Sequence, residues 1–278
     1  MPELPEVEVV RRGLNEHIVG RTFDSIEVAH PRAVRDSTVD LTTILPGLRV
    51  TGTGRRGKFL WLTLSDGGCL LVHLRMSGQM LVGAPGSVDS PHARIRARMG
   101  DVELVFVDQR TFGSWQYCQL VDGIPELASH IAMDPFEAGF DVDETAALMR
   151  KKRSAVKTVL LNQAVVSGIG SIYADEAMWA ARVAPWQRAD TLAQESAVEL
   201  LDASRDVMER ALAQGGTSFD SLYVNVNGAS GYFARSLNAY GRAGEPCARC
   251  GDAIVKTVVN QRSSYYCPTC QDPEQNRE

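Results

Sequence analysis

The 278-residue sequence lacks any apolar run that approaches the ~20 residues of a membrane-spanning helix. Its first residues are acidic and lack the apolar segment of a secretory signal peptide. It also contains no internal repeat and no low-complexity tract. These absences disfavour membrane, secreted and repeat proteins, and we expect a cytoplasmic protein with no membrane partner.

The sequence also lacks the excess of basic residues that is typical of proteins that bind nucleic acids. It has 29 basic and 34 acidic residues, a formal net charge of −5, which taken as a whole disfavours such a partner. The charges are segregated, however, because residues 134–149 contain five acids and no base, and residues 150–157 contain five bases and no acid. Residues 228–270 contain five bases and two acids. A locally basic face is therefore one interpretation, and an ordinary solvated surface is the other.

Cysteine is scarce, but four of the six cysteines have a regular spacing. Two C-x2-C pairs are formed by Cys247, Cys250, Cys267 and Cys270. Four thiolates on two short loops predict one structural Zn²⁺, and two disulfides are the alternative, which a reducing compartment disfavours. A closed four-cysteine site folds the tail and does not catalyse. Cys69 and Cys118 lie in strand-like segments and are predicted to be buried apolar residues.

Hydrophobic periodicity divides the chain into a strand-rich part and a helical part. Short β-rich segments are predicted at residues 59–64, 69–74, 93–98 and 102–107, which indicates a sandwich or barrel. Helical patterns are predicted at residues 143–163, 171–183 and 195–216. The last residues, 271–278, are predicted to be a frayed end.

The first residues, MPELPEVEVVRRGL, have two interpretations. The structural one is an amphipathic helix whose apolar side carries Val7, Val10 and Leu14, with Gly13 or Gly20 as its end. The chemical one starts from Pro2. Removal of Met1 exposes a secondary amine that can attack an aldehyde-like carbon, and Glu3 can transfer protons beside it.

Six segments, in order along the chain, are similar to those of one family. They are MPELPE, RRGK, HLRMSG, DQRTFG, GIGSIYADEA and YGRAGEPCARCG. Together with the four cysteines, they resemble the bacterial formamidopyrimidine-DNA glycosylases over essentially the whole length. The resemblance implies an α+β fold with three domains. These are a catalytic β-sandwich with an N-terminal helix at residues 1–130, a helix-two-turn-helix domain at 131–224, and a lesion-capping loop with a zinc-finger β-hairpin at 225–278.

The implied activity is that of a bifunctional glycosylase and abasic-site lyase in base excision repair. It would remove 8-oxoguanine and formamidopyrimidines from double-stranded DNA and then cleave the strand by β,δ-elimination, acting as a monomer at the nucleoid. By resemblance, Pro2 is the nucleophile that forms a Schiff base with the sugar, and Glu3 protonates the sugar ring oxygen. Lys58 assists the first elimination, although a strand lysine with a solvated end is its alternative interpretation. Arg262 contacts phosphate and is linked to the second elimination.

The resemblance also implies a set of DNA contacts. The predicted phosphate contacts are His73, His92, Arg110, Lys152 and Lys157. Met76, Arg110 and Phe112 would fill the gap left by the extruded base, although Met76 and Phe112 would otherwise be taken for core residues. The turn at Gly170 and Ser171 offers backbone N–H groups to a phosphate.

Two positions depart from the family pattern. Ser171 replaces an asparagine whose side chain binds phosphate, and we expect its shorter hydroxyl to cap the following helix. Thr111 replaces a frequent second arginine.

Two other functions are compatible with parts of this pattern. One is an endonuclease VIII-like glycosylase for oxidised pyrimidines, which the first eight residues and the Met76, Arg110 and Phe112 set disfavour. The other is a zinc-dependent paralogue that binds lesions without cutting, which the presence of Pro2, Glu3 and Lys58 disfavours.

Overall fold

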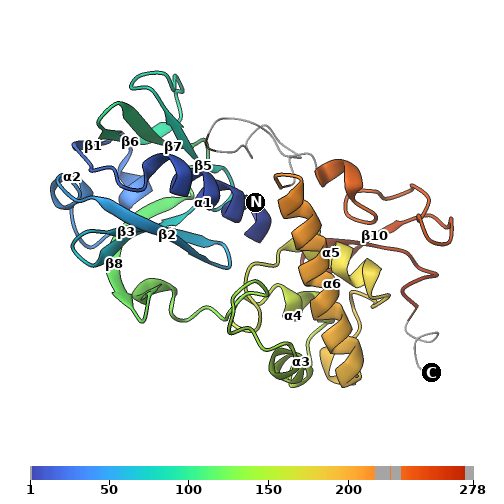
Figure 1. Cartoon of the computed structure of the whole chain (residues 1–278). Helices are drawn as coiled ribbons and strands as arrows, with labels where there is room; N and C mark the ends of the chain where they lie inside the picture. Colours follow the sequence, from blue (N-terminus) through green and yellow to red (C-terminus); the bar gives the residue numbers. More distant parts are fainter. Residues whose placement is uncertain (1, 217–225, 227–232, 273–278) are drawn as a thin grey trace. The chain divides into compact units, whose positions relative to one another are not determined.

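The computed structural model describes residues 2–216, 226 and 233–272. The chain divides into two compact units, one of Met1–His130 with Leu212–Ala234 and one of Ile131–Ala211 with Arg235–Glu278. Each unit is described by itself (Figure 1). No helix among the described residues is long and apolar enough to cross a membrane. The lesion-capping loop is expected within residues 221–233, and this segment lies outside the described residues except for Val226 and Phe233.

The described part of the first unit contains nine strands in two antiparallel sheets, in the orders β1-β6-β7-β5 and β2-β3-β4-β8-β9. The strands are β1 (Ser25–Val28), β2 (Val50–Arg56), β3 (Phe59–Leu64), β4 (Gly68–His73), β5 (Gly78–Gly83), β6 (Ala93–Met99), β7 (Val102–Asp108), β8 (Ser114–Val121) and β9 (Ile124–Pro125). Side chains of both sheets, such as Leu62 and Val72 from one and Ile95 and Phe106 from the other, share one apolar core. The predicted sandwich is therefore confirmed.

Helix α1 (Leu4–Ile18) packs against this sandwich beside strands β2 and β3 (Figure 1). Its apolar stripe recurs at helical spacing, and Val10, Leu14 and Ile18 are buried in the core. Each such side chain stabilises the fold by about 1.5–3 kcal/mol when it is fully buried. The helix that carries Pro2 and Glu3 at its start is thus fixed by its own hydrophobic face.

Gly20, and not Gly13, follows the end of α1. Gly20 has a φ of +88°, the left-handed conformation that favours glycine after a helix. Gly13 lies inside the helix, where a Cβ atom would lie 2.5 Å from Cγ2 of Val226. The backbone carbonyl of Val226 also accepts a hydrogen bond from the N–H of Val82 (2.9 Å). Gly13 therefore provides the space in which Val226 packs on α1.

The second unit is mainly helical. Its longer helices are α3 (Val142–Arg150), α4 (Val156–Leu160), α5 (Ser171–Ala180) and α6 (Gln194–Ala213), the last of which extends into the first unit. The short helices of the described chain are α2 (Leu41–Ile44), η1 (Pro31–Val34), η2 (Glu126–Ala128), η3 (Ala189–Thr191) and η4 (Phe233–Ser236). The prediction of one continuous helical pattern over residues 143–163 is wrong. Ala155 is extended, with φ −55° and ψ 142°, because it pairs with Arg188 in an antiparallel bridge that interrupts the helix.

The last two described strands, β10 (Val255–Val259) and β11 (Arg262–Tyr266), form a hairpin. The two turn residues, Asn260 and Gln261, both have positive φ, as type I′ turns require. The prediction of a frayed end is wrong for Gln271. Gln271 is only 1% exposed and its side-chain amide donates to the carbonyl of Val183 (2.8 Å), whereas residues 273–278 lie outside the described residues.

Candidate active site and nucleic-acid interface

Pro2 and Glu3 are buried at the N-terminal end of α1. Glu3 is the N-cap residue and is 3% exposed. Its backbone N–H donates to the carboxylate of Glu6 (2.9 Å), and the two residues form a capping box. The helix end therefore fixes the backbone that carries the predicted nucleophile and acid, at the positive end of the helix dipole.

Lys58 lies in the two-residue turn that joins β2 to β3. The turn is closed by the pair Arg56 and Phe59, and Gly57, its first residue, has a φ of +55°. Type II′ hairpin turns favour glycine at this first position. Lys58 is only 7% exposed. It is therefore a buried cation at the tip of a tight turn, and not a strand lysine with a solvated end.

His73, at the end of β4, is a neighbour of Lys58. Burial, together with the charges of Arg75 and Lys58, lowers the pKa of His73 to about 3. Its Nδ1 accepts the backbone N–H of Arg75 (2.9 Å), and its ring packs edge-to-face on Phe59 (4.3 Å between centroids). His73 is therefore neutral near pH 7 and keeps its proton on Nε2, where it can donate to an anion.

Met76, Arg110 and Phe112 lie on exposed loops of the first unit. Met76 is 39% and Phe112 48% exposed, so neither is a core residue. A guanidinium nitrogen of Arg110 lies 3.8 Å from the sulfur of Met76. Exposed apolar side chains beside an arginine have the chemistry of a wedge that inserts into a duplex. That role remains a prediction.

The carboxylate of Asp108 holds the loop that carries Arg110 and Phe112. It is fully buried and accepts hydrogen bonds from the hydroxyl of Ser77 (2.5 Å) and the backbone N–H of Gly113 (2.8 Å). The N–H of Arg110 donates to the same carboxylate (3.2 Å). A Cβ atom at Gly113 would lie 2.7 Å from the ring of Phe106, so the loop returns to the sheet through a position without room for a side chain.

Thr111, one of the two departures from the family pattern, has a φ of +54°. This conformation is strained for a β-branched residue and persists only where the surroundings impose it. Arg35 supplies part of that constraint, because its guanidinium donates to the carbonyls of Thr111 (3.2 Å) and Phe112 (2.8 Å). Arg35 thus supports the loop in which the family pattern has a second arginine at position 111.

His92 is half-buried, directly precedes β6 and is connected to the same loop. The guanidinium of Arg94 lies 3.3 Å from Nδ1 of His92 and donates to the backbone carbonyl of Asp108 (2.8 Å). The N–H of Asp108 in turn donates to the carbonyl of His92 (2.9 Å). Most of the predicted site residues therefore belong to the first unit, namely Pro2, Glu3, Lys58, His73, Met76, His92, Arg110 and Phe112.

Lys157, predicted to contact phosphate, is fully buried in the second unit. Its ammonium donates to the carboxylate of Asp175 (2.7 Å) and to the carbonyl of Ser263 (2.5 Å). Burial raises the pKa of Asp175 to about 6, although Lys157 acts in the opposite direction. We therefore correct the prediction: the ammonium of Lys157 faces an internal carboxylate, because this pairing is the way a buried cation is compensated.

Asp175 also fixes the strand that begins at Arg262. Its carboxylate accepts the hydroxyl of Ser264 (2.7 Å) and the backbone N–H of Tyr265 (3.0 Å). Arg262 itself is exposed and directly follows the hairpin turn. Glu176, the residue after Asp175 on α5, accepts the backbone N–H groups of Asn238, Ala239 and Tyr240 at 2.7–2.9 Å. Two buried carboxylates of α5 thus anchor the C-terminal segment.

The predicted turn at Gly170 and Ser171 starts α5. Gly170 is the N-cap residue, with φ −123°, and Ser171 is the first helical residue. The expectation that the Ser171 hydroxyl caps the helix is therefore wrong, because α5 has no side-chain cap. The side chain of Gln163 accepts the N–H of Gly168 (2.9 Å) and donates to the carbonyl of Ile169 (3.0 Å), which fixes the turn from outside the helix.

Lys152, in the link between α3 and α4, is exposed.

The four cysteines of the tail converge on one point. Their sulfur atoms all lie within 4.8 Å of one another, with Cys247 and Cys270 3.9 Å apart and Cys250 and Cys267 3.4 Å apart. A tetrahedral site with Zn–S bonds of about 2.3 Å has sulfur–sulfur edges of about 3.8 Å. The donor set fits one structural zinc ion, and none of the six cysteines is joined in a disulfide. Cys69 and Cys118 are buried, as predicted.

Two side chains dock this cysteine site onto α5. The indole N–H of Trp179 donates to the sulfur of Cys247 (3.3 Å). The guanidinium of Arg249 stacks on the ring of Trp179 (4.3 Å) and donates to the carbonyls of Trp179 and Ala180 (3.1 and 3.2 Å) at the end of α5. The second unit thus contains a hairpin that the zinc site and α5 hold together.

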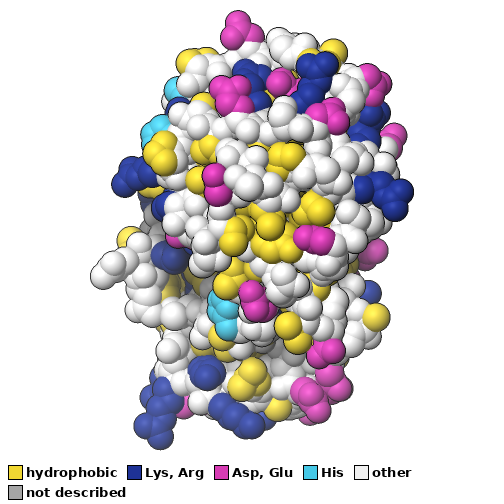
Figure 2. Space-filling model, turned by 90° about the vertical axis from the view of Figure 1, so that its left-hand side faces the viewer, with side chains coloured by type: hydrophobic (Ala, Val, Ile, Leu, Met, Phe, Trp, Pro, Cys, Tyr) yellow, Lys and Arg dark blue, Asp and Glu magenta, His cyan; other side chains and the backbone are white. Residues whose placement is uncertain are grey.

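Several of the acidic side chains that give the negative net charge are buried. Among the described residues, seven acids and two lysines are buried, so much of the acidic excess lies inside the protein. The buried acids are Glu3, Glu6, Glu8, Asp108, Asp134, Asp175 and Glu176. On the face shown in Figure 2, side chains of both signs are interspersed without a large patch of either. The negative net charge therefore does not argue against an anionic partner.

Three family models match the chain in succession. The formamidopyrimidine-DNA glycosylase N-terminal domain matches residues 1–115, the formamidopyrimidine-DNA glycosylase H2TH domain matches residues 131–222, and the zinc finger found in FPG and IleRS matches residues 244–273. Curated relatives match over almost the full length. The formamidopyrimidine-DNA glycosylase of Corynebacterium jeikeium is 57% identical, over 98% of this chain and all of that protein. That of Mycolicibacterium smegmatis is 56% identical, over 98% and 97% of the two chains.

Solved structures also match over almost the full length of the chain. Lactococcus lactis Fpg in complex with DNA containing an abasic site has a TM-score of 0.87 at 33% identity, over 97% of this chain and 99% of that one. The complex of the same enzyme with DNA containing Fapy-dG has a TM-score of 0.86 at 33% identity, over 97% and 100% of the two chains.

The environment of His73 predicts its titration. Because its pKa is lowered to about 3, the fold favours the neutral ring, and protonation below the ordinary histidine pKa opposes folding. We expect the ¹⁵N and ¹³C resonances of His73 to remain those of a neutral ring with an acceptor Nδ1 from pH 8 to pH 5. The urea-unfolded protein serves as the reference, with titration near ~6.5. A midpoint for folded His73 near that of the unfolded protein would contradict this environment.

The cysteine geometry predicts one zinc ion per chain. Metal analysis should give one equivalent in the wild type and in Cys69→Ala, and much less than one in Cys250→Ser. Chelation should remove the hydrogen-exchange protection of β10 and β11 and change the fluorescence of Trp179, whose indole contacts a ligand sulfur. A metal-free protein with unchanged protection and fluorescence would show that the hairpin folds without zinc.

Proposed function

The chain belongs to the formamidopyrimidine-DNA glycosylase family and is a DNA glycosylase of base excision repair, and we propose that its nucleophile is the amine of Pro2. The observation that carries this proposal is the burial of Pro2 and Glu3 at the start of α1, in the same unit as the buried Lys58. We propose that its substrates are 8-oxoguanine and formamidopyrimidine lesions in double-stranded DNA, and abasic sites. With chromosomal DNA as substrate, the enzyme would act at the nucleoid.

In the first step, the nitrogen of Pro2 attacks C1′ of the damaged nucleotide. The glycosidic bond breaks, and the base leaves with the proton that the amine loses. Glu3, as a carboxylic acid, gives its proton to the ring oxygen as the bond between C1′ and that oxygen opens. The products are the free base, an open sugar joined to Pro2 as an iminium ion, and the Glu3 carboxylate.

In the second step, the iminium ion makes the C2′ proton acidic, and the Glu3 carboxylate accepts it. The electron pair forms the C2′–C3′ double bond as the C3′–oxygen bond breaks, and the 3′ phosphate leaves as an anion. The Lys58 ammonium compensates the charge of this leaving group. We place Arg262 at the other phosphate, where its guanidinium supports the second elimination.

The remaining predicted residues would hold the DNA. A base inside a duplex must be extruded before it can react, at a cost of a few kcal/mol. We propose that Met76, Arg110 and Phe112 offset this cost by filling the gap. Neutral His73 would donate its Nε2 proton to a phosphate, and His92, Lys152 and the turn at Gly170 and Ser171 would contact further phosphates.

Blocking the N-terminal amine tests the nucleophile. A variant with one extra residue before Pro2 should give no covalent adduct with abasic-site DNA in the presence of borohydride, because an acylated nitrogen cannot form an iminium ion. The wild type should be trapped. Glu3→Gln should lose excision of 8-oxoguanine more than cleavage of a preformed abasic site, because its proton donation serves the earlier step.

Normal trapping of the blocked protein would transfer the nucleophile to another amine, with Lys58 as the first candidate. Loss of trapping in both proteins would favour the non-cutting paralogue. Faster excision of thymine glycol than of 8-oxoguanine would favour the endonuclease VIII-like alternative.

The corrected role of Lys157 predicts a contrast with Lys152. Lys152→Ala removes an exposed cation, so the slope of log K against log salt should become shallower by about 0.9 if it neutralises one phosphate. Lys157→Ala should leave the salt slope unchanged but destabilise the fold by about 3–5 kcal/mol, because it strands the buried Asp175 carboxylate. Binding titrations at several salt concentrations and urea unfolding measure the two effects. A shallower slope for Lys157→Ala without destabilisation would restore the original prediction.

A further inference from the structure

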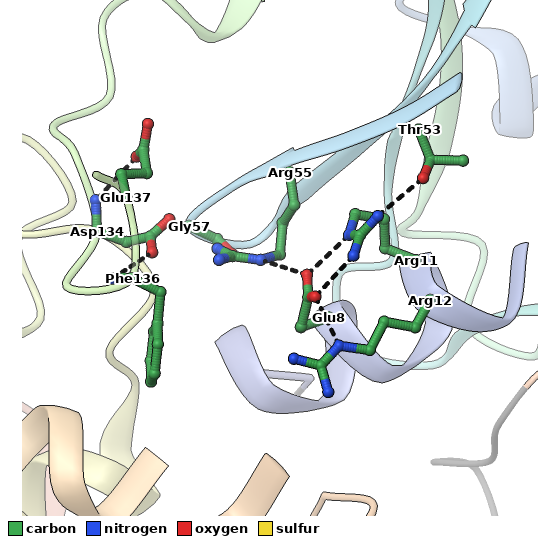
Figure 3. A network of polar contacts seen from close by, with 9 residues as sticks. All are labelled: Glu8, Arg11, Arg12, Thr53, Arg55, Gly57, Asp134, Phe136 and Glu137. Carbon is green, nitrogen blue, oxygen red and sulfur yellow. Dashed lines mark hydrogen bonds and ion pairs between the residues drawn. The ribbon is translucent and has the colours of Figure 1, made fainter. Parts of the chain in front are cut away.

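One carboxylate on α1 gathers three arginine side chains (Figure 3). The Glu8 carboxylate accepts two hydrogen bonds from Arg11 (2.8 and 2.9 Å), one from Arg12 (2.9 Å) and one from Arg55 (3.1 Å). Arg11 and Arg12 belong to α1 itself, at the i+3 and i+4 positions. Two members of this cluster join the helix to the sheet: Arg55 comes from β2, and Nη1 of Arg11 donates to the hydroxyl of Thr53 on the same strand (2.9 Å).

Arg55 also reaches the turn that carries Lys58. While its Nε donates to Glu8, its Nη1 donates to the backbone carbonyl of Gly57 (3.1 Å). Gly57 immediately precedes Lys58 in the two-residue turn. The planar guanidinium thus connects a carboxylate on α1 with the peptide group next to the predicted catalytic lysine, as seen in Figure 3.

The same helix carries Pro2 and Glu3 at its start. Glu8 lies five residues after Glu3, within a continuous hydrogen-bonded helix whose apolar side is buried in the core. The nucleophile and the lysine therefore lie on two separate elements, α1 and the β2–β3 turn. Among the described side chains, Arg55 is hydrogen-bonded to both elements.

The connection is buried and permanently charged. The side chain of Arg55 is 7% exposed and that of Glu8 is 11% exposed. Burial alone would raise the pKa of Glu8, but the hydrogen bonds and charges of the three arginines outweigh it and lower this pKa to about 2. The Glu8 carboxylate therefore stays ionised over the pH range in which a glycosylase works. The contact between Arg55 and Glu8 is not a pH-dependent one.

We propose that Arg55 is a positioning residue, which sets the distance between the Lys58 ammonium and the Pro2 nitrogen by joining Glu8 to the carbonyl of Gly57. This inference rests on the proposed roles of Pro2 and Lys58. In this proposal, Arg55 does not contact the DNA. The elimination step depends on Lys58 meeting the phosphate of a sugar that is already held covalently by Pro2, so a displaced lysine slows this step more than it slows formation of the iminium ion.

The chain offers a matched control in Arg12. Arg12 also donates to Glu8, but its side chain is 59% exposed and it lies on α1, so it does not join two elements. Arg12→Lys and Arg55→Lys both retain a positive charge beside Glu8. Only the second removes the planar group that bonds Glu8 and Gly57 at once, because an ammonium is a point donor without a fixed fork.

The experiment measures two rates on DNA with a preformed abasic site. Iminium formation is the rate of borohydride trapping, and elimination is the rate of strand cleavage in single turnover without borohydride. Displacement of a reacting group by about 1 Å can cost up to about 100-fold, and we expect Arg55→Lys to slow elimination about tenfold. Trapping should change less than twofold, and the dissociation constant for the DNA should not change.

Glu8→Gln provides a second way to break the same connection, from the helix side. It should show the same shift from cleavage towards trapped adduct, whereas Arg12→Lys should behave like the wild type. Melting temperatures identify loss of folded protein, which lowers both rates by one common factor and cannot change their ratio.

An unchanged ratio in Arg55→Lys would overturn the inference, as would an equal shift in Arg12→Lys. These outcomes leave the proposed function intact, because the wild type is still trapped and still cleaves. Absence of a trapped adduct in the wild type would instead overturn the Schiff-base chemistry, and this inference would fail with it.

Discussion

A buried carboxylate must be paired with hydrogen-bond donors. In this protein, buried carboxylates bond to several of the segments that carry predicted functional side chains. Glu8 bonds Arg55 and through it the turn of Lys58. Asp108 bonds the backbone of the loop that presents Arg110 and Phe112. Asp175 bonds Lys157 and the strand that begins at Arg262. In each case an internal acid fixes the backbone or a side chain of the segment by hydrogen bonds.

This arrangement explains how an acidic chain can serve an anionic substrate. Two of these acids, Glu8 and Asp175, are buried and paired with cations, so they add little to the field outside the protein. In contrast, Arg110, Lys152 and Arg262 are exposed. Lys58 is the reverse case, a buried cation placed at the tip of a turn. The fold thus separates charges that orient the site from charges that can meet phosphate.

Local patterns predicted much of this protein. The zinc site follows from two C-x2-C pairs, and the helix at the N-terminus follows from the period of Val7, Val10 and Leu14, because each of these patterns can be recognised in a short stretch of sequence. Contacts between distant segments were not predictable in this way. The bridge between Ala155 and Arg188 interrupts a good helical pattern, and the partner of Lys157 lies 18 residues away, on another helix. Likewise, nothing in the sequence indicates that Arg55 contacts Glu8, 47 residues away.

The central claim is that the covalent chemistry belongs to the N-terminal proline, held by α1. Its most direct test is to reduce the complex of the wild-type protein and abasic-site DNA with borohydride, digest both components and locate the sugar remnant by tandem mass spectrometry. The account predicts the added mass on the nitrogen of Pro2 in the N-terminal peptide, with Met1 absent. Added mass on Lys58, or on any other lysine, with an unmodified N-terminal peptide would contradict it.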